Sequence, residues 1–127
     1  MDWKDIDDNL IKRKSQSIAS ILKSEKIDAQ STLLLSSNDL GVIRNGGRRG
    51  AAHGPKVILN QLKKFADHSK LQEVGVVEVA TQAQEDFNSM QTSSIDKIAS
   101  VKSKKFIHIG GGHDHVYPFV MGLELKS

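Results

Sequence analysis

The sequence has 127 residues, of which 38% are hydrophobic and 26% charged, and its formal net charge is +3. This length and balance fit one soluble, globular domain and leave no room for two ordinary ones. The absence of cysteine excludes disulfides, thiolate metal sites and cysteine nucleophiles.

Membrane and secretory classes are not expected from the amino-acid sequence. It holds no run of about 20 apolar residues that would span a bilayer, and its first residues lack the apolar stretch of a secretory signal. A cytoplasmic protein without a membrane partner is therefore expected. The short basic runs at residues 12–14 and 102–105 contain no interleaved aromatic residues, so we predict a solvated face and no nucleic-acid partner.

The first third of the chain predicts a helix, a strand and a long loop. Apolar residues recur at intervals of three and four up to about Lys26, which is typical of an amphipathic helix; they are Ile6, Leu10, Ile11, Ile18, Ile21 and Leu22. The short apolar run at residues 32–36 indicates a buried strand. Residues 37–54 are rich in glycine and arginine and predict a long loop, which in a compact domain is often functional.

The remaining elements alternate between helices and strands. Gly54-Pro55 opens a predicted helix, and the β-branched stretch from Val74 to Ala80 predicts a strand. A helix at about residues 87–101, a strand at 106–109 and a helix at 117–125 follow. This alternation predicts an α/β fold with three layers, in which helices cover both faces of a parallel sheet.

Two predicted loops follow strands, where α/β proteins bind ligands. One is the Arg/Gly loop of residues 37–54, and the other is Gly110-Gly111-Gly112-His113-Asp114-His115. The three glycines permit a sharp turn and a close approach, and a neutral imidazole at His113 is able to ligate a metal. From the residues alone, a glycine-rich turn whose polar groups face solvent or cap the helix remains an equal alternative.

These two loops resemble motifs of the ureohydrolases, the superfamily of arginase, agmatinase and formimidoylglutamase. Residues 109–115 are similar to the first metal motif, a strand that ends in Gly-Gly-Asp-His-Ser or Gly-Gly-Gly-His-Glu. Gly112 favours the formimidoylglutamase branch. Residues 41–55 are similar to the Gly-Val-x-Arg-Asn-x-Gly-Arg-x-Gly-Ala-x-x-Gly-Pro stretch of that branch. The resemblance runs from about residue 30 onward.

The resemblance implies an arginase-like parallel sheet and two manganese ions that generate a bridging hydroxide for attack on an amidine or guanidinium carbon. It assigns His113 as a ligand of one ion. Asp114 stands where the branch has Glu or Ser, and His115 matches no ligand of the motif. His108 is interpreted as a hydrogen-bonded sheet residue, and His53 and His68 as ordinary loop or surface residues.

Residues Arg44, Asn45 and Arg48 are candidate substrate contacts. Arginine suits bidentate recognition of a carboxylate such as that of glutamate. The alternative for Arg44 and Asn45 is a structural role, in which they brace the loop or a subunit interface. The sequence does not decide between these two roles.

The later motifs of the superfamily, Asp-x-His-x-Asp and Asp-x-Asp, have no usable counterpart, because Asp5-Ile6-Asp7 lies in the predicted N-terminal helix. Residues 1–127 are therefore expected to be the N-terminal portion of a single arginase-like domain, with about three of its strands and no hydrolase activity alone. An open sheet edge favours a missing C-terminal segment, another chain or a homo-oligomer as partner.

The expected function of the whole protein is manganese-dependent hydrolysis of linear amidines, with formimidoylglutamase as the leading assignment. Under it, N-formimidoyl-glutamate yields glutamate and formamide in histidine degradation. The alternatives are a guanidino hydrolase of the arginase or agmatinase type, and a non-catalytic module that retains the fold.

Overall fold

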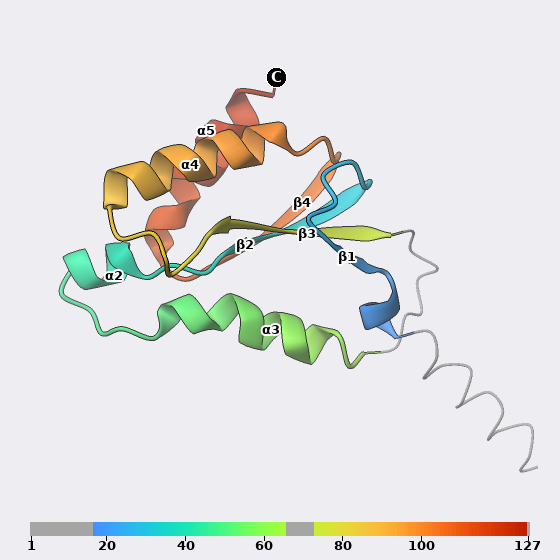
Figure 1. The fold of residues 1–127 in the computed structure, drawn as a ribbon, viewed down its shortest axis with the longest axis horizontal. Helices are drawn as coiled ribbons and strands as arrows, with labels where there is room; N and C mark the ends of the chain where they lie inside the picture. Colours follow the sequence, from blue (N-terminus) through green and yellow to red (C-terminus); the bar gives the residue numbers. More distant parts are fainter. Residues whose placement is uncertain (1–16, 66–72, 127) are drawn as a thin grey trace, which may run out of the picture.

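The structure is a computed structural model, and it describes residues 17–65 and 73–126. These residues form a parallel sheet between two helical layers (Figure 1), which confirms the predicted α/β fold with three layers. The strands are β1 (Leu22–Ser24), β2 (Ser31–Ser36), β3 (Val74–Ala80) and β4 (Lys105–Gly110). The helices are α2 (Leu40–Arg44), α3 (Gly54–Leu62), α4 (Phe87–Ser100) and α5 (Val116–Glu124).

Three 3-10 turns complete the described elements: η1 (Ile18–Ser20), η2 (Ala51–His53) and η3 (His113–His115). The strand order is β1-β3-β2-β4, and all three strand pairs are parallel. None of the helices in the described ranges has the length and apolar character needed to cross a lipid bilayer.

The predicted N-terminal helix is wrong where the structure describes it. Residues 18–20 form a 3-10 turn, and Leu22–Ser24 pair with β3 as a short edge strand. Ile21 and Leu22 pack against the apolar core beneath the sheet, and pairing with β3 satisfies backbone groups that a helix would bond internally. The remaining apolar residues of that predicted helix, Ile6, Leu10 and Ile11, lie outside the described residues.

The predicted loop of residues 37–54 is partly ordered into helical turns. It contains α2, with five residues, and the 3-10 turn η2 before α3 begins at Gly54. The Asp39 carboxylate accepts a hydrogen bond of 2.9 Å from the Gly50 amide and so joins the two ends of this segment. The glycine content obscured these turns because glycine disfavours helix on average, whereas a side-chain contact fixes them here.

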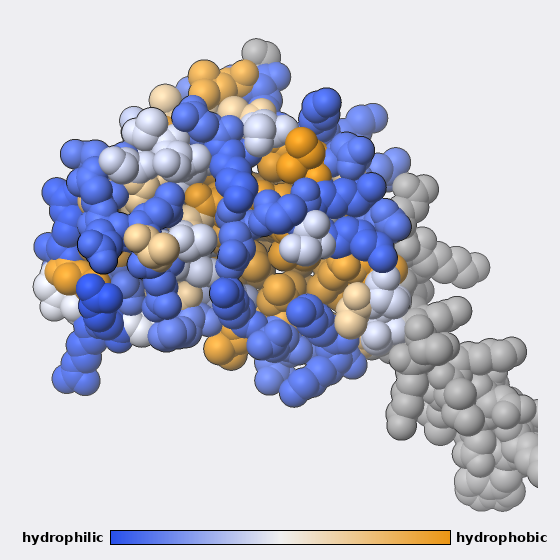
Figure 2. Space-filling view, viewed as in Figure 1, coloured by the Kyte–Doolittle hydropathy of each residue, from blue (hydrophilic) through white to orange (hydrophobic). Residues whose placement is uncertain are grey.

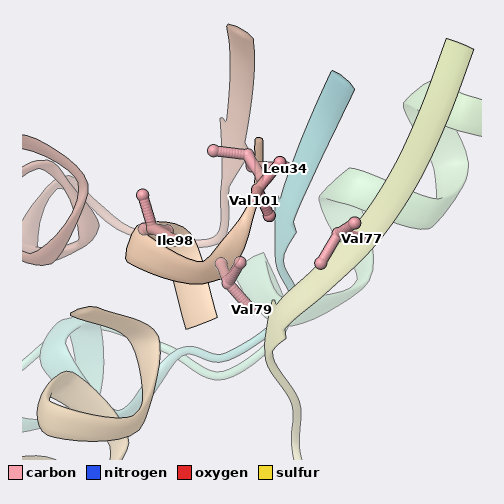
Figure 3. Packing of buried hydrophobic residues seen from close by; sticks show 5 residues of the cluster. All are labelled: Leu34, Val77, Val79, Ile98 and Val101. Carbon is pink, nitrogen blue, oxygen red and sulfur yellow. The ribbon is translucent and has the colours of Figure 1, made fainter. Parts of the chain in front are cut away.

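Two apolar cores lie on opposite faces of the sheet. The first, drawn in Figure 3, lies on the face covered by α4 and α5. The second lies between the sheet and α3. Their buried members are Leu34, Val77, Val79, Ile98 and Val101 on the first face, and Leu33, Leu35, Leu59 and Val74 on the second. Successive residues of β2 thus enter opposite cores, as the pleat of a strand covered on both faces requires.

The outer surface is mainly polar, with apolar side chains visible between the two helical layers in Figure 2. Among the described residues, β4 pairs with β2 alone and leaves its other edge open. Ile107 on this strand is 63% exposed. An open strand edge with an exposed isoleucine favours pairing with another segment or chain.

Candidate active site

The carboxyl ends of three parallel strands meet at one edge of the sheet. Ser36 at the end of β2 is in register with Ala80 of β3 and with Gly110 of β4. The segments that follow these strands therefore leave the sheet side by side. They hold the two sequence motifs, residues 41–55 and 110–115, and the start of α4.

A buried asparagine ties these segments together. Asn38, 1% exposed, donates from Nδ2 to the carbonyls of Thr81 at 2.8 Å and Gln84 at 3.2 Å, and its Oδ1 accepts from the Leu40 amide. The main-chain oxygen of Asn38 forms a hydrogen bond of 2.8 Å with Nε2 of His115. A buried, satisfied polar network of this kind holds loops in one arrangement. No motif in the sequence distinguishes Asn38 from the other polar residues of its loop.

The glycines of the second motif permit this close packing. A Cβ at Gly111 would collide with the Asn38 carbonyl oxygen and approach the Ala51 carbonyl oxygen to 3.2 Å. Gly41 in the first motif similarly lies against the Asp114 carboxylate, with no space for a Cβ. The two motifs are therefore in direct contact, although about 70 residues separate them in the sequence.

A cleft of about 530 Å³ opens between the motif loops and the start of α4. Its lining includes Arg44, Asn45, Phe87, His113 and Asp114. The structure thus brings together three of the four predicted site residues. The fourth, Arg48, is exposed and is not part of the lining.

Arg44 lies over the ring of Phe87, with Cζ 4.3 Å from the ring centroid. This cation–π contact gives Arg44 a partner within the structure, which is compatible with the alternative that Arg44 braces the loop. Arg44 nevertheless lines the cleft, where a substrate contact is also possible. Phe87 is the first residue of the helix predicted at about residues 87–101. No pattern in the sequence indicated that it would meet Arg44.

His115 is buried and 1% exposed, whereas His113 is exposed at the cleft. The Nδ1 atom of His115 and the Oδ2 atom of Asp114 are buried without a hydrogen-bond partner among the described residues. The burial of His115 had a signal in the sequence, because it shares a helical stripe with Phe119 and Gly122.

Imidazole and carboxylate donors of this loop are of the type that manganese accepts. However, no group of three or more His, Cys, Asp or Glu residues in the described ranges is placed to hold a metal ion. Residues His113, Asp114 and His115 therefore do not form a metal centre by themselves. A complete centre would need ligands from outside residues 17–65 and 73–126.

The other histidines have separate environments. His108 shares a hydrogen bond of 2.8 Å between Nε2 and Ser36 Oγ, which confirms its interpretation as a hydrogen-bonded sheet residue. Burial, with a smaller electrostatic contribution from the nearby His115 ring, lowers the pKa of His108 from 6.5 to about 4. His53 is exposed and lies 3.5 Å from Gln82 Nε2, whereas His68 lies outside the described residues.

Comparison with known proteins supports the resemblance inferred from the two motifs. The chain is 32% identical over 89 residues to formimidoylglutamase of Clostridium tetani, an alignment that covers 67% of this chain and 26% of that relative. Formimidoylglutamases of Streptococcus pyogenes serotypes M49 and M3 are each 31% identical over 90 residues, 68% of this chain and 27% of the relative. No family model matches the sequence. The chain thus spans about a quarter of the length of these curated relatives.

Proposed function

We propose that this chain is the N-terminal portion of a single arginase-like domain in a manganese-dependent hydrolase of linear amidines. The leading substrate is N-formimidoyl-glutamate, which yields glutamate and formamide in histidine degradation. The sequence similarity to formimidoylglutamases over two-thirds of the chain supports this assignment. A cytoplasmic location, with a small-molecule substrate and no nucleic-acid or membrane partner, is part of the same proposal.

The observation that carries the proposal is the convergence of the two motifs on one cleft. Gly41 packs against Asp114, and Arg44 and His113 line the same cavity. Loops beyond the carboxyl ends of parallel strands are where α/β enzymes place their ligands. A metal ligand, His113, and two carboxylate-binding side chains, Arg44 and Asn45, in the lining of one cleft would suit an amidino acid, whose reacting carbon and carboxylates belong to one small molecule.

Individual residues have distinct roles in this proposal. His113 ligates one metal ion, and Arg44 and Asn45 bind a substrate carboxylate, with Arg48 as a more peripheral contact. Guanidinium groups bind carboxylates through paired N–H donors. The two manganese ions would need their other ligands from outside the described residues.

The first test is a manganese titration of the longest reading frame that contains residues 1–127, followed by electron paramagnetic resonance. The change from His113 to Ala should weaken Mn²⁺ binding about tenfold or more, since ligand-sphere changes have effects of this size. His53→Ala is the matched control, because His53 is an exposed histidine outside the cleft lining. Equal affinities of the wild type and His113→Ala would contradict the assignment of His113.

The second test is formamide release from N-formimidoyl-glutamate by the longest reading frame that contains residues 1–127. We expect manganese-dependent turnover from that protein and none from residues 1–127 alone. Turnover of arginine or agmatine instead would assign the guanidino branch. Absence of turnover on all three substrates with manganese would favour the non-catalytic module.

A further inference from the structure

The side chains of Phe87 and Arg44 are in contact at the cleft, although they come from two separate parts of the chain. Arg44 is the last residue of α2, and Phe87 is the first residue of α4. The guanidinium carbon lies 4.3 Å from the ring centroid, and both side chains line the cleft that includes His113. The contact therefore connects the arginine of the first motif to a helix that lies outside both motifs.

The carboxylate of Asp86, which precedes Phe87 in the sequence, already accepts hydrogen bonds from Ser89. Asp86 caps α4, and its Oδ2 accepts hydrogen bonds from the Ser89 amide at 3.0 Å and the Ser89 hydroxyl at 2.6 Å. These two hydrogen bonds lower the pKa of Asp86, and the positive charge of Arg44 adds a smaller effect. Among the described residues, Arg44 forms no ion pair within 4.0 Å.

Stacking on an aromatic ring uses the face of a guanidinium group and leaves its in-plane N–H donors available. It also restricts a long side chain that would otherwise lose rotamer entropy on binding a ligand. An arginine fixed in this way, and not paired with a carboxylate of the described residues, is prepared to bind an external carboxylate.

We propose that Phe87 is a positioning residue, which holds Arg44 at the cleft for recognition of a substrate carboxylate. This inference rests on the proposed function, because it assigns the ligand of Arg44 to the amidino acid. In this arrangement Phe87 does not contact the carboxylate itself and affects its binding only by holding Arg44. The role of Phe87 is to reduce the freedom that Arg44 loses when the ligand binds.

The test measures L-glutamate binding to the full 127-residue chain by calorimetry, for the wild type, Arg44→Gln, Phe87→Leu and Phe87→Trp. We expect Phe87→Leu to weaken binding about threefold to tenfold, which is the size of a cation–π contact. Phe87→Trp retains the aromatic face and should restore binding, an outcome that a general packing role would not produce. Phe65→Leu is the matched control, since Phe65 is 64% exposed and outside the cleft lining.

A second readout needs no ligand. Protons on the Arg44 side chain should be shifted upfield by the Phe87 ring in the nuclear magnetic resonance spectrum, and Phe87→Leu should remove this shift. Loss of the shift together with weaker glutamate binding supports the inference. An unchanged shift, or unchanged binding in Phe87→Leu while Arg44→Gln binds poorly, overturns the inference and leaves the proposed function intact. No glutamate binding by the wild type overturns the inference, whereas the proposed function is judged by the turnover test on the longer reading frame.

Discussion

Protonation of His108 should control the acid stability of this fold. The ring stacks on Phe119, with centroids 4.9 Å apart and planes at 16°, and meets the ring of His115 edge-on at 6.4 Å. Its Nε2 shares a hydrogen bond of 2.8 Å with Ser36 Oγ. In these surroundings burial lowers the pKa of His108 to about 4, against a usual value of 6.5. Between about pH 4 and pH 6.5, His108 is therefore mostly neutral in the folded protein but protonated in the unfolded chain.

The sign of the effect follows from proton linkage. Below about pH 6.5 the unfolded chain binds a proton at His108, whereas the folded protein binds it only near pH 4. The stability contributed by neutral His108 is thus complete above pH 6.5, falls as the pH drops toward 4, and is absent below that. The full pKa difference corresponds to about 3.4 kcal/mol, and partial exposure of His108 reduces our expectation to about 2 kcal/mol.

The assay is urea unfolding followed by far-ultraviolet circular dichroism between pH 7.5 and pH 4.5. His108→Gln retains hydrogen-bonding groups but has no proton to gain, so its free energy of unfolding should fall about 1.5 kcal/mol less than that of the wild type over this range, which stops short of full protonation. His53→Gln serves as the control, because His53 is exposed. Parallel pH dependence of the wild type and His108→Gln would refute the reasoning, since the acidic groups common to both cancel.

Three further predictions test the core, the motif contact and the sheet edge. Leu34→Ala should lower the free energy of unfolding by about 3 kcal/mol in urea titration, because Leu34 is 0% exposed at the centre of a core; a loss below 1 kcal/mol would contradict this packing. Gly111→Ala should cost about 2 kcal/mol in the same assay through overpacking against the Asn38 carbonyl, whereas Gly54→Ala, where a Cβ meets open space, should be nearly neutral. Ile107→Lys should shift the sedimentation of the chain toward the monomer, because a charge on an open edge strand opposes pairing; unchanged sedimentation would show that β4 is not the associating edge.

Local residue patterns were sufficient to predict most of the elements. The β-branched stretch of residues 74–80 coincides with β3, and Gly54-Pro55 begins α3 as predicted. These segments succeed because their periodicity and terminal residues agree with their environment in the fold. The amphipathic pattern through Ile21 and Leu22 failed because an apolar stripe that ends at a sheet edge is satisfied equally well by a short strand.

The chemistry of the candidate site divides in the same way. The sequence by itself determined the residue types that meet at the cleft, because the motifs hold Arg44, Asn45 and His113 within short stretches that follow strands. Only the tertiary structure decided that Phe87 stacks on Arg44 and that His115 is buried against Asn38. These contacts join residues 43 and 77 positions apart, and they depend on the register of parallel strands, which no local pattern specifies.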